Sequence, residues 1–342
     1  MKDYSGVWIL GEQRNGKVQT IAHELLNRGR SLADKRRVPL TAIILGKAEP
    51  EDLDMLIKRG ADQVIAIEAD ELATFLPEPY TNAMAYLVDK YKPEIIIAGA
   101  TSTGRTLMPL LAIRFHAGLT ADCTGLDIEE ETGNLLQTRP AIGGNIMATI
   151  KSPSHRPQMA TVRPKSTRPA AFNAARTGKI IREEVDPSLL GSRVKLLKFT
   201  KSAEETANIQ EADVIIAGGR GLKKGDNFQL INELAALLDG AVGASRDAVD
   251  RGWISYPHQV GLSGKTVSPK LYLCAGISGS IQHLAGIKTA ENIVAINTNP
   301  EAQIFQVANY GIVADLFEII PILIEKIKAK KAGQGTDTRS AS

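Results

Sequence analysis

The chain has 342 residues, of which 43% are hydrophobic and 23% are charged, an ordinary globular composition with enough length for two domains. Its 41 basic and 38 acidic residues nearly balance, so the formal net charge of +3 gives no support to a nucleic-acid or membrane surface. The two cysteines, Cys123 and Cys274, form no CxxC pair, which excludes a disulfide framework and indicates a reducing compartment.

No apolar run is long enough to cross a bilayer, so we expect no stable membrane insertion. The first residues lack the apolar region of a signal peptide and lead directly into an apolar strand. The sequence therefore predicts a cytoplasmic protein.

The first half of the chain alternates short apolar runs with amphipathic periods, which predict strands and helices respectively. The predicted strands are 7–10, 40–45, 63–67 and 94–98, and the predicted helices are 19–32, 51–59 and 81–91. This order predicts a parallel sheet flanked by helices, as in nucleotide-binding α/β domains.

From residue 121 the pattern changes. Residues 127–136 predict a hairpin, and 142–150 and 158–163 predict two further strands. We expect these strands to form an antiparallel extension of the first sheet. The proline-rich residues 152–169 are expected to be an extended crossover.

The polar residues 179–191 are the predicted linker, so the N-terminal domain is expected to be 1–191. The C-terminal domain, 192–330, repeats the alternation and is predicted to be doubly wound α/β. Its predicted strands are 193–199, 213–217, 271–275 and 293–296, and its predicted helices are 227–238, 302–310 and 314–330. The tail, 331–342, is expected to be disordered.

Four glycine-marked loops follow short apolar runs between residues 213 and 316. They are 218–221, 240–246, 259–265 and 276–283. Glycine lets backbone N–H groups approach an anion closely, and a following helix adds favourable dipole charge. Because Arg220, Arg246 and His283 lie in these loops, we predict one large phosphorylated ligand held by several strand ends.

Other site classes find no support in the sequence. Residues 261–266 resemble the end of a Walker A loop, but Gln259 stands where glycine is required and Pro269 opposes a following helix, so a nucleotide triphosphatase is rejected. The histidines and cysteines lack metal-ligand spacing, and no Ser/His/Asp or paired-carboxylate set can be assembled for hydrolysis. His283 by itself is compatible with a structural role in the first turn of a helix.

Six blocks, in this order and spacing, strongly resemble the alpha subunit of electron transfer flavoprotein. They are GGRGL (218–222), GASRDAVD (243–250), QVGLSGK (259–265), GISGSIQHLAG (276–286), VAIN (294–297) and PEAQIFQVANYGIVADLF (300–317). The resemblance is dense from 213 to 320 and consistent over the rest of the chain apart from the tail. It implies a heterodimer with a beta subunit and FAD held mainly in the C-terminal domain.

The resemblance also implies a role for individual residues. Arg220 and the loop 278–282 would serve the FAD phosphates and ribityl chain, and Arg246 would lie over the isoalloxazine and favour an anionic flavin. His283 would face the N1/C2=O edge, and the Ser263 hydroxyl would lie near N5, where many members carry threonine. Such charges and donors stabilise reduced flavin and tune its second electron.

Of the assigned residues, Arg246, Ser263 and His283 are implied to act on the redox chemistry itself, and Asn297, Asp315 and Leu316 to hold the adenosine half. The full set implied to bind FAD is Arg220, Ser245, Arg246, Gln259, Val260, Gly261, Leu262, Ser263, Gly276, Ser278, Gly279, Ser280, Ile281, Gln282, His283, Asn297, Asp315 and Leu316.

Three further blocks resemble the electron-bifurcating subgroup: GLTADCTGLD (118–127), TRPAIGGN (138–145) and HRPQMATVRP (155–164). There, a second FAD in the beta subunit takes hydride from NADH. One electron passes to ferredoxin or flavodoxin, and the other passes through the FAD of this chain to an acyl-CoA dehydrogenase. The chain would then be an electron carrier with oxidoreductase activity only as part of a complex.

Three alternatives stay open. The first is a non-bifurcating electron transfer flavoprotein that carries electrons from dehydrogenases to a quinone reductase. The second is an adenine-nucleotide-binding sensor without redox activity. The third, a stand-alone NAD-dependent dehydrogenase, is disfavoured because the chain lacks a GxGxxG loop and a catalytic acid/base set.

Overall fold

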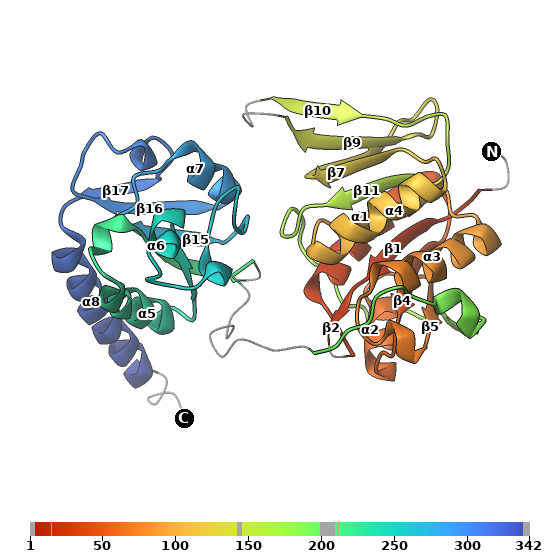
Figure 1. The fold of residues 1–342 in the computed structure, drawn as a ribbon, viewed down its shortest axis with the longest axis horizontal. Coiled ribbons are helices and arrows are strands. Elements are labelled where there is room, and N and C mark those ends of the chain that lie inside the picture. Colours follow the sequence, from red (N-terminus) through yellow and green to blue (C-terminus); the bar gives the residue numbers. More distant parts are fainter. Residues whose placement is uncertain (1–3, 15, 142–145, 199–208, 211, 338–342) are drawn as a thin grey trace. The chain divides into compact units, whose positions relative to one another are not determined.

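The structure is a computed structural model that describes residues 4–14, 16–141, 146–198, 209–210 and 212–337 (Figure 1). The chain divides into two compact units between Lys198 and Phe199. Both units are α/β, as the sequence predicts. No helix in the described residues is long and apolar enough to span a bilayer.

The first unit contains a seven-stranded sheet in which every pairing is parallel, with the order β12-β5-β4-β1-β6-β11-β7. Its strands are β1 (Val7–Gly11), β4 (Leu40–Leu45), β5 (Gln63–Ile67), β6 (Ile95–Gly99), β7 (Leu119–Cys123), β11 (Gln158–Val162) and β12 (Lys179–Arg182). Its helices are α1 (Thr20–Arg36), α2 (Pro50–Lys58), α3 (Pro77–Tyr91) and α4 (Ser102–Arg114). The predicted alternation of strands and helices is confirmed.

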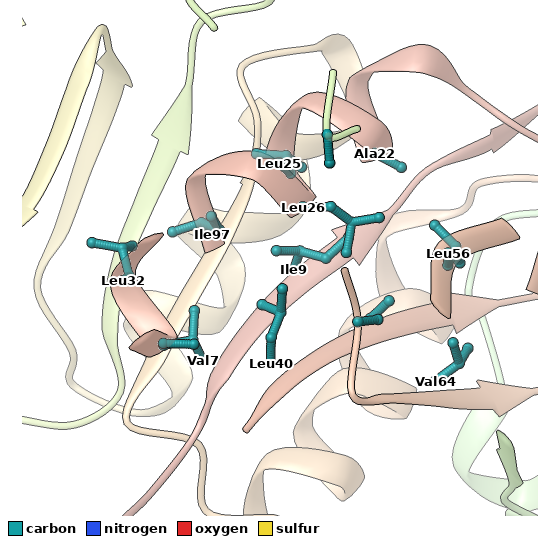
Figure 2. Close-up of a cluster of buried hydrophobic side chains, with 14 of the residues drawn as sticks. Val7, Ile9, Ala22, Leu25, Leu26, Leu32, Leu40, Leu56, Val64 and Ile97 are labelled. Atoms are coloured by element: carbon teal, nitrogen blue, oxygen red, sulfur yellow. The ribbon is translucent and has the colours of Figure 1, made fainter. Parts of the chain in front are cut away.

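One buried cluster of this unit lies between the central strands and α1, and a second lies between the same strands and the helices α3 and α4. Figure 2 shows Leu25 and Leu26 of α1 close to Ile9 and Leu40 of neighbouring strands, and all four side chains are 0% exposed. Both faces of a central parallel strand are covered, which explains why β1 is apolar throughout rather than alternating.

The antiparallel part differs from the prediction. β8 (Gly125–Ile128), β9 (Leu135–Pro140) and β10 (Met147–Ile150) form a separate three-stranded sheet that includes the predicted hairpin. β10 is shorter than the predicted strand 142–150, of which 142–145 lie outside the described residues. β11 joins the main sheet in parallel between β6 and β7, because all of its residues are buried and only a two-sided position covers them.

The predicted linker at 179–191 is wrong. β12 lies there and pairs with β5, and the short 3₁₀ helix η2 (Pro187–Leu190) follows it. Arg193 then donates its backbone N–H to Glu78 of α3 at 2.7 Å, so the chain still belongs to the first unit at this point. The predicted strand at 193–199 is absent from 193–198, and residue 199 lies outside the described part.

Glu12 follows β1 at the carboxyl edge of this sheet. Its burial raises the pKa of its carboxyl to about 7, although the Thr101 hydroxyl lies 2.7 and 2.8 Å from the two carboxyl oxygens and opposes that shift. A carboxyl with a raised pKa binds its proton more tightly in the folded than in the unfolded chain. Its contribution to stability is therefore full below the ordinary pKa of 4.5 and is lost as the pH rises through about 7.

We accordingly expect the first unit to unfold at a lower temperature at pH 8 than at pH 5.5. Glu12→Gln, which keeps a neutral polar side chain, should remove a pH-dependent part worth about 1–2 kcal/mol. Thermal unfolding of both proteins across this pH range is the measurement. Identical pH dependence in both would show that Glu12 does not titrate as its burial requires.

The second unit contains a five-stranded parallel sheet in the order β14-β13-β15-β16-β17. Its strands are β13 (Val214–Gly218), β14 (Ala241–Ala244), β15 (Leu271–Ala275), β16 (Asn292–Asn297) and β17 (Tyr310–Val313). Its helices are α5 (Phe228–Leu237), α6 (Arg246–Asp250), α7 (Ile281–Ile287) and α8 (Leu316–Asp337). Side chains of α5 and α8 share one buried cluster and those of α7 another, so the predicted doubly wound architecture is confirmed.

Two predictions for this unit are wrong. Residues 302–310 form only the short 3₁₀ helix η6 (Gln303–Gln306) before β17, where the β-branched Ile312 and Val313 favour a strand. α8 continues to Asp337, well into the predicted tail; Lys331 and Ala332 are strong helix formers, but the helix also continues through two glycines. The rest of the predicted tail, 338–342, lies outside the described residues.

Candidate functional site

The carboxyl ends of the five parallel strands in the second unit lie at one edge of the sheet. All four predicted glycine-marked loops reach this edge, as do the residues that follow β16 and β17. Ligands of doubly wound sheets bind outside the carboxyl ends of the strands, where the connections diverge to opposite sides. β14 pairs with one side of β13, and the next strand along the chain, β15, pairs with its other side. The crevice is therefore expected between β13 and β15.

The two loops at this crevice touch through their backbones. Gly219 donates its N–H to Ala275 at 3.0 Å, and Gly221 donates its N–H to Gly276 at 3.0 Å. A Cβ atom on Gly221 would lie 2.6 Å from the Cα of Gly276, so a side chain there would separate the loops. Glycine is required at this position because the two backbones meet.

A pocket of about 300 Å³ opens beside these loops. The predicted residues that line it are Arg220, Gly276, Ser278, Asn297, Asp315 and Leu316. Lys223 also lines the pocket and was not predicted, although it directly follows the GGRGL block. Guanidinium and ammonium groups suit phosphates, and a carboxylate suits ribose hydroxyls, so this lining fits a nucleotide.

Two of the pocket residues also hold the backbone around it. Asn297 donates from Nδ2 to the Ile277 carbonyl at 3.0 Å, which ties the end of β16 to the loop after β15. Asp315 accepts the N–H of Phe317 at 2.9 Å at the start of α8. Two side chains that were predicted to bind the ligand therefore also hold the backbone of the pocket wall in place.

A second group of predicted residues surrounds the end of β14. Ser245 caps α6 by accepting the Ala248 N–H at 3.4 Å. Arg246 is the first residue of that helix, and its side chain is 69% exposed and paired with Asp250 at 3.2 Å. The site thus has a guanidinium at its surface, held only by an exposed pair.

The loop 259–265 is hydrogen-bonded both to the end of β14 and to the first turn of α7. Val260 donates its N–H to the Ala244 carbonyl at 2.9 Å, and Leu262 donates its N–H to the Gln282 carbonyl at 2.9 Å. The Ser263 hydroxyl is exposed and accepts from Nε2 of Gln259 at 3.0 Å. The loop therefore presents one oriented hydroxyl at the edge of the sheet.

His283 lies buried between β15 and the loop 259–265. Its ring is 4% exposed, with Nε2 2.9 Å from the Tyr272 hydroxyl and Nδ1 3.1 Å from the Val260 carbonyl. Burial lowers the pKa of His283 to about 4. His283 lies in the first turn of α7, on the buried side of that helix together with Gly286 and Ile287.

A larger hollow of about 710 Å³ lies beside α5 and β14 and is lined by Phe228, Trp253 and His258 among others. It contains none of the predicted site residues. The strand-end loops, and not this larger hollow, mark the candidate site.

Residues 7–188 match a family model described as "Electron transfer flavoprotein domain", and residues 208–288 match "Electron transfer flavoprotein FAD-binding domain". The chain is similar to the electron transfer flavoprotein subunit alpha of Thermoanaerobacterium thermosaccharolyticum, at 51% identity over 97% of this chain and 100% of that protein. The corresponding subunit of Clostridium acetobutylicum is 46% identical over 96% of this chain and 98% of its own length. Protein FixB of Rhizobium meliloti is 42% identical over 95% of this chain and 93% of its own length.

Proposed function

Because the chain belongs to the family of electron transfer flavoprotein alpha subunits, we propose that it passes single electrons through an FAD held at the carboxyl edge of its second sheet. Its cofactor is FAD, and an alpha subunit of this family pairs with a beta subunit. The observation that carries the placement is the convergence of four strand ends, those of β13, β15, β16 and β17, on one nucleotide-sized pocket.

The residues at this edge fit FAD. Arg220 and Lys223 supply positive charge for the pyrophosphate, and Asp315 supplies an acceptor for ribose hydroxyls. The contact between Gly221 and Gly276 leaves backbone at the crevice where a side chain would block a phosphate. When bound, FAD supplies a ring system that accepts and donates electrons one at a time.

The side chains of the second group orient and tune that ring. We propose that Arg246 lies against the isoalloxazine, where its charge favours electron density on the ring. Ser263 offers a hydroxyl that Gln259 holds in place, so its direction does not depend on solvent. His283 is neutral and buried, so the positive charge at the ring is assigned to Arg246.

Arg246→Ala is therefore expected to lower the midpoint potential of the bound FAD, by about 60 mV for a one-electron step if the charge favours the reduced ring tenfold. Stability should change little, because the pair with Asp250 is exposed. Arg251→Ala is the matched control, since Arg251 forms the same kind of i,i+4 pair, with Asp247, at 3.1 Å. A spectroelectrochemical titration measures both, and equal shifts in the two variants would refute a specific role for Arg246.

We further propose that the complex bifurcates electrons. Each of the three bifurcation-like blocks contributes a charged residue to one region of the first unit: Asp122, Arg163, which binds it, and Arg139, whose charge acts on it. Arg163 donates to both oxygens of Asp122 at 3.1 and 2.6 Å, and Arg105 lies 3.6 Å from the same carboxylate. Burial favours the neutral acid, but these bonds and the arginine charges outweigh it and lower the pKa of Asp122.

The cluster carries more guanidinium than carboxylate charge, which suits a negatively charged nucleotide. This supports a second FAD, bound by the beta subunit and reduced by NADH. Ferredoxin or flavodoxin is then the proposed low-potential acceptor and an acyl-CoA dehydrogenase the partner for the other electron. The cytoplasm stays the predicted location.

The decisive experiment is to quantify the nucleotides released from the chain co-purified with its natural beta subunit. Two FAD per heterodimer support bifurcation, whereas one FAD with AMP indicates a simple electron carrier. A complex without FAD would overturn the assignment and favour the nucleotide sensor.

A further inference from the structure

The tip of the loop 259–265, which carries Ser263, is not fixed by burial. Leu262 is 67% exposed, and Ser263 is exposed as well. The base of the loop is closed by its main chain, where Lys265 donates its N–H to the carbonyl oxygen of Gln259 at 2.7 Å. Hydrogen bonds, and not packing, must therefore fix the direction of the Ser263 side chain.

Tyr256 holds the main chain at this tip. It lies in the 3₁₀ helix η5 (Tyr256–His258), and its hydroxyl donates to the carbonyl oxygen of Ser263 at 2.9 Å. The neighbouring Leu262 donates its N–H to the carbonyl oxygen of Gln282 in α7 at 2.9 Å. The tip is therefore tied both to α7 and to η5.

The helix η5 is anchored to the sheet, so it can support the tip. Nδ1 of His258 lies 2.8 Å from the carbonyl oxygen of Val242 in β14, and because a carbonyl can only accept, Nδ1 is the donor. Gln259 follows η5 and donates its N–H to the carbonyl oxygen of Tyr256 at 2.9 Å. A chain of hydrogen bonds thus runs from β14 through η5 to Ser263.

The hydroxyl of Ser263 has a defined polarity. Gln259 donates to it from Nε2 at 3.0 Å, so the Ser263 oxygen is the acceptor in this bond. A serine hydroxyl carries one hydrogen, and here that hydrogen is left to be donated to another group. Ser263 can therefore act as a hydrogen-bond donor toward a ligand at this edge, as long as its main chain stays in place.

We propose that Tyr256 is a positioning residue for the redox site. Its hydroxyl holds the main chain of Ser263, so the Ser263 hydroxyl keeps one direction toward the flavin. The inference rests on the proposed FAD site at this edge of the sheet. Tyr256 is not among the residues that the sequence predicts, and it acts through Ser263 rather than through contact with the cofactor.

The test measures the midpoint potential of FAD in the full chain with its beta subunit, for Tyr256→Phe, Ser263→Ala and the double variant. Tyr256→Phe should change the reduction equilibrium about threefold, or about 28 mV for one electron, in the same direction as Ser263→Ala. In the double variant, Tyr256→Phe should add nothing to the shift of Ser263→Ala, because its effect passes through the hydroxyl. Phenylalanine keeps the ring of a side chain that is 56% exposed, so we expect the variant to fold.

Tyr310→Phe is the matched control. It removes the same hydroxyl from a tyrosine of the same unit that is 66% exposed. Because Tyr310 lies in β17 and not beside the loop 259–265, the midpoint potential should stay at the wild-type value.

Two results with FAD would overturn the proposal: a wild-type potential in Tyr256→Phe, or shifts that add up in the double variant. Hydrogen exchange tests it without the cofactor. In the complex stripped of FAD, the Leu262 N–H should exchange about threefold faster in Tyr256→Phe, and equal rates would also overturn the proposal. A wild-type complex that never holds FAD would instead refute the proposed function, and the exchange rates would still decide whether Tyr256 holds the loop.

Discussion

Gly286→Ala is expected to destabilise the second unit by about 3 kcal/mol and to weaken FAD binding about a hundredfold. The Cβ of alanine would lie 2.6 Å from the N and Cα atoms of Gly261, and both are backbone atoms that cannot turn aside. The loop 259–265 would have to leave α7 and lose the bond from Leu262 to Gln282.

The expected sign of the stability change separates the contact with Gly261 from the helix propensity of alanine. Gly286 lies inside a helix, where alanine is normally better than glycine by about 0.8–1 kcal/mol, so a loss of stability must come from the contact with Gly261. Gly191→Ala is the control, because the nearest atom to its added Cβ is 3.6 Å away. Calorimetry and FAD titration are the measurements, and a more stable Gly286→Ala protein would show that the loop does not pack on α7.

Glu94→Gln is expected to destabilise the first unit by about 3 kcal/mol. Glu94 is 5% exposed, and Arg36 donates to its two carboxylate oxygens at 2.8, 3.0 and 3.1 Å. Arg156 lies 3.9 Å from the same carboxylate, and its side chain is 11% exposed. Removing the negative charge would leave two guanidinium groups facing each other in a partly buried site.

The matched control for Glu94→Gln is the same substitution at Glu233. It also pairs a glutamate with a cation, Lys328 at 2.7 Å, but the two side chains are 47% and 54% exposed. Exposed pairs contribute less than about 1 kcal/mol, so Glu233→Gln should be almost neutral. Similar losses in the two variants, measured by denaturant unfolding, would mean that burial does not set the strength of the Glu94 cluster.

The parts of the fold that could be predicted are those with strong local patterns. β1 and β6 are continuous apolar runs because both of their faces are buried. The edge strands β12 and β17 were missed, because each has four residues with little burial and derives its structure from pairing with a neighbour. Their sequences have too little periodicity to predict a strand from the local pattern.

The candidate site, too, could be predicted only where the local sequence pattern is strong. The glycine-marked loops predicted a phosphate-binding edge, and the structure brings Arg220, Ser278 and Asp315 into one pocket there. The hydrogen-bond partners of His283 within the protein could not be predicted, because one is Tyr272 in a different element and the other is a carbonyl in a third. Sequence spacing can predict on which helix or strand a residue lies, but it does not predict which groups form hydrogen bonds with its polar atoms.

Because four strand ends line one pocket, bound FAD would hold them together, and the stability of the folded chain then depends on the vitamin from which FAD is made. A ligand that binds only the folded unit stabilises it by about 4 kcal/mol when its free concentration is a thousand times its Kd. Chains synthesised in a cell short of riboflavin would lack this contribution and would open more often to proteases. The amount of this protein in the cell is therefore expected to follow the supply of flavin as well as the expression of its gene.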